Sequence, residues 1–198
     1  MGTRHLIAVV LKGEYKVAQY GQWDGYPTGQ GIIICDFIQN EMKLTKFKKA
    51  LKECKFISSK EIQRRYVSVG ADPKSEWVNM DISDKFAAKW PHLVRECGGD
   101  ILSYIQDGGV RELQDSIDFA ADSLFCEWAY VLDLDNKVLE VYKGFNKAPL
   151  PKKDRFKSME KNKGDKYYPV RLYAKYPFKE ATRDAMDKLD KRCKKNCR

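Results

Sequence analysis

The residue types best suited to chemistry lie together in residues 22–27 (QWDGYP). Trp23 and Tyr26 are large aromatic residues on either side of Asp24. Aromatic faces bind planar rings, and a carboxylate between them accepts hydrogen bonds from a base, a sugar hydroxyl or an arginine. The segment therefore predicts a loop that holds a nucleotide-like small molecule or side chains of a protein partner. The predicted ligand-binding residues are Arg4, Gln22, Trp23, Asp24 and Tyr26.

A structural turn is the alternative interpretation of this motif. Gly25 permits a backbone angle that other residues resist, and Pro27 fixes the exit of the chain into the next helix. In that case the two aromatic rings are core side chains and Asp24 bonds its own backbone. The binding interpretation instead predicts that the loop of residues 20–31 lines the main concave pocket, with Trp23 or Tyr26 exposed on its wall.

An enzyme is a further interpretation, with Asp24 in the site of a hydrolase or transferase and Arg4 or His5 as its helper. The supply of histidine is small, because the chain holds two. An N-terminal nucleophile uses its own α-amine as the base. Thr3 is the nearest candidate, and two residues precede it. No catalytic residue is assigned from this pattern.

Cofactor and metal sites are not indicated by the sequence. The six cysteines are scattered and form no C-x-x-C pair, which predicts reduced thiols, several of them buried. Cys193 and Cys197 lie one helical turn apart and could pair on oxidation, but without a nearby histidine they do not make a zinc site. Asp133 and Asp135 border a predicted turn, where we expect solvated side chains. The sequence predicts neither a cofactor nor a metal.

Charge is distributed unevenly along the chain. Residues 1–141 hold 18 Lys and Arg against 21 Asp and Glu, whereas residues 142–198 hold 19 against 7. The net charge of +9 therefore comes entirely from the last quarter. A basic tail on a mildly acidic body favours weak contact with a polyanion, so nucleic-acid binding through the tail is a third functional interpretation.

Apolar periodicity and turn signals predict the elements that position these residues. Two β-hairpins are predicted, each with a short turn between two apolar or alternating runs. Short amphipathic or capped segments between them predict helices, the first of which begins near Thr28 as its N-cap. The predicted strands are 5–11, 15–20, 125–134, 138–142 and 167–173, and the main predicted helices begin near residues 28, 43, 59, 83, 101 and 178.

These elements predict an α+β fold. Its antiparallel sheet consists of the two hairpins, and a cluster of short helices covers one face. We expect a globular domain in residues 1–145 and a basic C-terminal extension in residues 146–198, with one strand and a helical tail. The extension has few large apolar residues outside 167–178. Deletion of residues 179–198 is therefore expected to leave the melting temperature nearly unchanged.

The opening M-G-T-R, followed by two strands and the motif W-D-G-Y-P-x-G-x-G, resembles a largely uncharacterised family found in bacteriophages, bacteria and some fungi. The resemblance covers residues 1–31 and, more weakly, residues 127–145. Members often carry His before the Trp-Asp-Gly-Tyr-Pro core, where this chain has Gln22. The family brings no established reaction. Its occurrence in phages implies a binding role in conflict between phage and host.

Length and hydropathy limit the class of protein. A chain of 198 residues corresponds to about one domain. The mean hydropathy is −0.60, and no apolar run approaches the roughly 18 residues of a membrane helix. The amino terminus has no signal-peptide pattern. These observations predict a cytoplasmic protein with no membrane partner.

Overall fold

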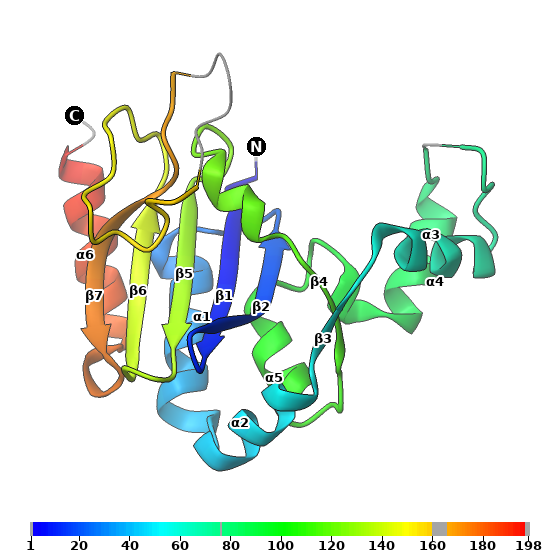
Figure 1. Ribbon diagram of the computed structural model, residues 1–198, viewed down its shortest axis with the longest axis horizontal. Helices are drawn as coiled ribbons and strands as arrows, with labels where there is room; N and C mark the ends of the chain where they lie inside the picture. The colour runs from blue at the N-terminus through cyan, green and yellow to red at the C-terminus, as the bar shows by residue number, and fades with distance from the viewer. Residues whose placement is uncertain (1, 76, 160–165, 197–198) are drawn as a thin grey trace.

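A five-stranded sheet forms the centre of the computed structural model, which describes residues 2–75, 77–159 and 166–196 (Figure 1). The strand order is β2-β1-β5-β6-β7, and only the pairing of β1 with β5 is parallel. The predicted α+β class and its two hairpins, β1–β2 and β5–β6, are confirmed. The strands are β1 (His5–Leu11), β2 (Glu14–Gly21), β5 (Trp128–Asp133), β6 (Val138–Lys143) and β7 (Arg171–Pro177).

The parallel pairing follows from the long connection between β2 and β5. Parallel neighbours need a crossover, and this crossover contains most of the helices. Helices cover one face of the sheet and enclose the larger core cluster, which includes Ile7, Phe47 and Leu132. The helices packed on this face are α1 (Ile32–Asp36), α2 (Leu44–Glu53), α5 (Ile101–Gln106) and α6 (Arg183–Asn196). None of the helices in the described segments is long and apolar enough to cross a bilayer.

Two helices stand away from the sheet as an arm (Figure 1). The arm has its own small apolar cluster, in which the ring of Tyr66 stacks on Phe86 with 3.8 Å between centroids. A short parallel ribbon lies at its base. The sequence analysis did not predict this ribbon, because its strands are three residues long. The arm helices are α3 (Ser59–Ser68) and α4 (Met80–Lys89), and the ribbon strands are β3 (Lys55–Ile57) and β4 (Glu112–Gln114).

Irregular segments cover the opposite face of the sheet. Leu6 and Val10 from β1 pack there with Phe156 and Val170 from the connection between β6 and β7. Figure 1 shows the described parts of this connection in front of the sheet and helices α1 and α6 behind it. Because both faces of β1 are covered, all seven of its residues are buried. This explains its nearly continuous apolar sequence.

The C-terminal segment is integrated into the same body. β7 is the fifth strand of the sheet, four residues further along the chain than the predicted strand began. Met186 and Leu189 of α6 are buried in the larger core cluster. Gln39 lies in the helical turn Phe37–Glu41 that follows α1, and it donates hydrogen bonds to the carbonyls of Phe178 and Ala181 just before α6. This packing reverses the expectation for truncation of the tail.

The two hairpin turns are joined by Asp135. Its carboxylate accepts the backbone N–H groups of Lys12 and Gly13, both at 2.9 Å. Asp133 accepts the backbone N–H of Asn136 at 2.9 Å and also pairs with Arg155 at 2.7 Å. Both carboxylates are therefore engaged in the fold, and the expectation of free, solvated side chains is wrong for Asp133, which is 3% exposed.

Candidate functional site

At one end of the strands, a line of paired residues, which we call the edge row, crosses all five strands of the sheet. The row reads Gly21, His5, Trp128, Lys143 and Arg171. Here β1, β5 and β7 begin, while β2 and β6 end. Adjacent strands lie about 4.8 Å apart, so the whole row spans roughly 20 Å. The loop of residues 22–27 leaves one end of this row, and a basic segment occupies the other.

The backbone of the 22–27 loop is held from three sides. Gly25 N–H donates to the carbonyl of Thr3 at 2.9 Å, and the buried Tyr130 hydroxyl donates to the carbonyl of Gly25 at 2.8 Å. Gln30 N–H donates to the carbonyl of Asp24 at 2.8 Å. The segment before β1 and the central strand β5 thus both hold the backbone of the loop.

Asp24 sits at a turn that requires close approach of the backbone. Its φ is +55°, in the left-handed region that costs energy for most residues but is tolerated by Asp and Asn. A Cβ at Gly29 would lie 2.1 Å from the Asp24 carbonyl oxygen, so this position accepts only glycine. The helical segment starts at Pro27, with Tyr26 as the residue before it. The prediction of Thr28 as N-cap is therefore wrong.

Gly29→Ala is expected to destabilise the protein by about 1–3 kcal/mol, because the added methyl group must displace backbone rather than a flexible side chain. Chemical denaturation of the variant and the wild type measures the difference. Thr28→Ala is the matched control, since Thr28 does not cap the helix and its loss is expected to be small. Equal stability of the two variants would contradict the tight turn.

The two rings of the motif are accessible to solvent. Trp23 is 47% exposed and Tyr26 is 37% exposed. The Tyr26 hydroxyl donates to Asp24 Oδ1 at 3.1 Å, and this bond raises the pKa of Tyr26. The Asp24 side chain is also exposed. The structural interpretation requires buried rings and a carboxylate spent on the backbone, and the structure has neither.

Arg4 and Gln22 contact other groups. The Arg4 guanidinium lies 4.8 Å from the centre of the Phe125 ring. Gln22 Oε1 accepts the hydroxyl of Tyr20 at 2.5 Å, and its backbone N–H donates to the carbonyl of Arg95 at 3.0 Å. The structure thus brings Asp24 and Tyr26 into contact, leaves the neighbouring Trp23 exposed, and gives Arg4 and Gln22 partners outside the motif.

His5 is buried beneath the motif. It is 1% exposed, and neither ring nitrogen has a hydrogen-bond partner among the described residues. Burial lowers its pKa to about 4, and nearby Thr3 and Asp24 oppose this shift only in part. A Cβ at Gly21 would lie 2.1 Å from the ring, and one at Gly25 would lie 2.7 Å from His5 Cβ. The imidazole is neutral at physiological pH and is shielded from any ligand on the surface.

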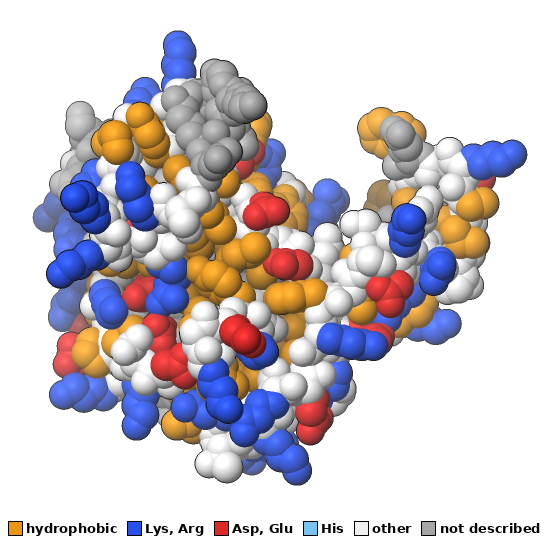
Figure 2. Space-filling view, in the orientation of Figure 1, with side chains coloured by type: hydrophobic (Ala, Val, Ile, Leu, Met, Phe, Trp, Pro, Cys, Tyr) orange, Lys and Arg blue, Asp and Glu red, His pale blue; other side chains and the backbone are white. Residues whose placement is uncertain are grey.

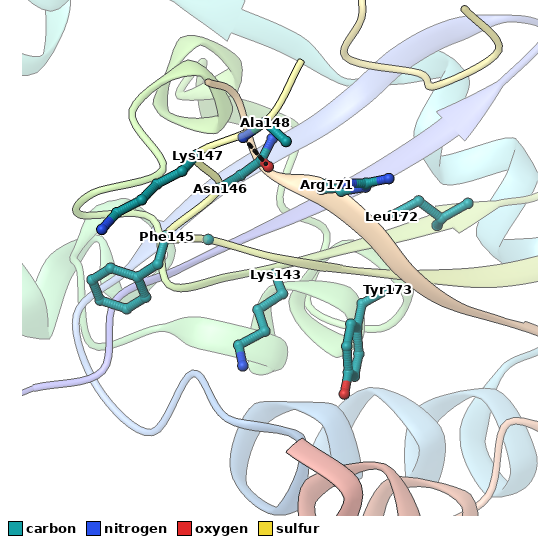
Figure 3. A pocket seen from close by; sticks show the side chains of 9 residues that line it. Lys143, Phe145, Asn146, Lys147, Ala148, Arg171, Leu172 and Tyr173 are labelled. Atoms are coloured by element: carbon teal, nitrogen blue, oxygen red, sulfur yellow. Dashed lines mark hydrogen bonds between the residues drawn. The ribbon is translucent and has the colours of Figure 1, made fainter. Parts of the chain in front are cut away.

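Concave surface occurs elsewhere in the described structure. A groove of about 940 Å³ runs between the sheet and the arm, and Tyr20 is the residue of the 20–31 loop that lines it. A hollow of about 550 Å³ lies at the basic end of the edge row (Figure 3). Neither ring of the motif lines these two hollows. Trp23 and Tyr26 are thus exposed without lining the main concavities that the sequence analysis expected them to line.

The hollow at the basic end was missed by the sequence analysis. We call it the basic hollow, and it is lined by residues 143–148 and 171–173. The signal in the sequence is the run Lys-Gly-Phe-Asn-Lys directly after the second hairpin. Its second half comes from the start of β7, and only the pairing of β6 with β7 brings the two segments together.

Comparison with known proteins gives no match: no family model fits the chain, and no curated protein or solved structure is significantly similar to it. The resemblance of residues 1–31 to a family found in bacteriophages stays a prediction.

Proposed function

We propose that the protein is a binding protein whose Trp23–Tyr26 loop holds a nucleotide-like ligand. The observation that supports this most directly is that Trp23 and Tyr26, which flank Asp24 in the sequence, are exposed together with its carboxylate. Large aromatic side chains are usually buried when they serve only the fold. Two of them exposed within four residues provide a surface on which a planar ring can stack.

The rigidity of the loop supports the same function. Its hydrogen bonds to Thr3, Tyr130 and Gln30 order the binding groups before a ligand arrives. Binding then loses less conformational freedom, which strengthens affinity. Asp24 also has a positive φ. Non-glycine residues with such backbone conformations are found preferentially at functional sites.

The carboxylate determines the class of ring that fits. Asp24 Oδ1 accepts a hydrogen bond from Tyr26, and an ionised carboxylate has further acceptor sites on both oxygens. These sites suit the N–H groups on the edge of a nucleobase. Burial of His5 disfavours the alternative of a hydrolase in which this imidazole acts directly on a substrate. Incubation with the same nucleotides, followed by product analysis, tests that alternative.

Trp23→Ala is expected to weaken binding of the best nucleoside in a panel by about 5- to 150-fold, because stacking of a base on an aromatic ring contributes about 1–3 kcal/mol. Asp24→Asn is expected to act in the same direction, since it removes the charge of the acceptor. Asparagine tolerates the left-handed backbone of Asp24, so this variant keeps the loop conformation. Isothermal titration calorimetry measures both affinities.

The matched control is Trp77→Ala, which removes a tryptophan that is 88% exposed near the arm. It is expected to leave nucleoside binding unchanged. Circular dichroism establishes that each variant is folded. If Trp23→Ala and Asp24→Asn fold and bind as the wild type does, or if no nucleoside binds the wild type, the proposed function is wrong.

A further inference from the structure

The basic hollow combines positive charge with aromatic surface. Lys143, Lys147 and Arg171 line it, together with Phe145 and Tyr173. No acidic residue is among the described residues that line it. Figure 3 shows Lys143 and Tyr173 extending side by side from β6 and β7, with Phe145 and Lys147 on the turn that follows β6. A hollow with this lining attracts an anion that also carries planar rings.

Cations lie over aromatic rings in and around the hollow. Lys147 Nζ lies 5.7 Å from the centre of the Tyr167 ring, and Lys143 Nζ lies 5.7 Å from that of Tyr173. The guanidinium of Arg192, from α6, lies 4.8 Å from the same Tyr173 ring. The basic surface therefore continues from the hollow onto the C-terminal helix. Figure 2 shows Lys and Arg side chains gathered on the side of the molecule where β7 and α6 lie.

The turn after β6 holds Phe145 in a fixed, exposed position. Phe145 has a φ of +53°, an unfavourable conformation for a bulky residue, and its side chain is 50% exposed. Its backbone N–H donates to the carbonyl of Ser123 at 2.6 Å. Asn146 is buried and donates its side-chain amide to the carbonyl of Pro169 at 2.9 Å. The strain is thus imposed by neighbouring segments, and it holds an apolar ring in solvent.

We infer that the basic hollow binds single-stranded nucleic acid. A site for a single strand combines cations that follow the phosphates with aromatic side chains that stack on unpaired bases. Here Lys147 and Arg171 are exposed cations and Phe145 is an exposed ring, on two segments joined by the sheet, while Lys143 donates its ammonium to Cys193 Sγ at 2.7 Å. The bases of a duplex are stacked on one another and do not reach such rings, so a duplex is expected to bind less well. This site is separate from the Trp23–Tyr26 loop and does not depend on the function proposed for it.

The inference is tested by the fluorescence anisotropy of a fluorescein-labelled single strand of about 12 nucleotides, measured over a series of salt concentrations. This length is within the range of about 4–16 nucleotides that an oligonucleotide-binding (OB) fold covers. Lys147→Gln with Arg171→Gln is expected to weaken binding by about tenfold or more and to reduce the salt slope by about 1.4, because each phosphate contact on a single strand contributes about 0.7. The control, Lys49→Gln with Lys52→Gln, removes the same charge from exposed positions of α2.

A second pair of variants tests the stacking. Phe145→Leu is expected to weaken binding by about 5- to 150-fold, whereas Phe145→Trp is expected to retain it. Trp23→Ala is expected to have no effect on this oligonucleotide. The inference is overturned if the wild type does not bind the strand, if both charge variants lose affinity equally, or if Phe145→Leu binds like the wild type. Equal affinity for a duplex, or binding only to phosphatidylserine vesicles, would also overturn it.

Discussion

Deletion of residues 179–198 is expected to lower the melting temperature by about 10 °C or more. The deletion removes Met186 and Leu189, whose side chains are 0% and 2% exposed. Burial of each such side chain contributes about 1.5–3 kcal/mol. In a protein of this size 1 kcal/mol corresponds to about 2–4 °C. The deletion also uncovers Ile34 and Tyr130 in the same core cluster, which adds to the loss.

Point substitutions in α6 distinguish the contribution of its packing to stability from the contribution of its charge. Leu189→Ala is expected to destabilise the protein by about 2–5 kcal/mol, because it leaves a cavity in the core. Lys188→Ala, at the neighbouring exposed position, is expected to change stability by less than about 0.5 kcal/mol. Differential scanning calorimetry of both variants and of the deletion provides the measurement. An unchanged melting temperature for the truncated chain would show that α6 does not contribute to the core.

Local patterns were sufficient to predict the hairpins but not how they join. β1 is almost wholly apolar, β2 alternates between apolar and polar residues, and a short turn joins them. Such a hairpin signal is local, because its parts lie within a few residues of one another. The parallel pairing of β1 with β5 joins residues more than 100 positions apart, and no local signal specifies it. The arm was predicted as helices without its position, because position depends on the ribbon of β3 and β4.

The two candidate sites also differ in whether local sequence is enough to predict them. The Trp23–Tyr26 loop is contiguous in sequence, so residue types and spacing were enough to predict it. The basic hollow combines Lys143 with Arg171, and these meet only because β6 pairs with β7. The tail was expected to be separable because its charge is high and its apolar residues are few. The helix nevertheless docks, because its apolar residues recur at helical spacing and all face the core.

A buried ion network holds the connection between β6 and β7 against the sheet. Arg155 lies in this connection, and its guanidinium donates to Asp133 Oδ2 and Glu140 Oε2, both at 2.7 Å. The two carboxylates are 3% and 5% exposed. Glu140 also accepts the hydroxyl of Tyr142 at 2.8 Å and the ammonium of Lys175 at 3.1 Å. Loss of the guanidinium leaves two buried carboxylates without their central cation.

Arg155→Ala is expected to destabilise the protein by about 3–5 kcal/mol at neutral pH, the usual cost of removing one partner of a buried ion pair. Lys175→Ala is the matched control, because Lys175 contacts the same carboxylate but its side chain is 47% exposed. An exposed pair contributes about 0–1 kcal/mol. Urea denaturation of both variants measures the two losses. Similar losses in the two variants would contradict a central role for Arg155.

At acid pH, the difference in stability between the wild type and Arg155→Ala is expected to be smaller than at neutral pH. Burial by itself raises the pKa of Glu140, but the bonds from Arg155, Tyr142 and Lys175 outweigh it and hold the pKa below its ordinary value of 4.5. A carboxylate with a lowered pKa in the folded state stabilises the protein above its unfolded pKa, and this stability is lost as the pH falls through the folded pKa. Wild-type stability should therefore fall as the pH drops below about 4.5. Arg155→Ala has already lost the cation that keeps the carboxylates ionised, so it should lose less stability over the same interval. If the stability of the wild type and that of Arg155→Ala fell equally with decreasing pH, this network would not be the cause of the loss of stability in acid.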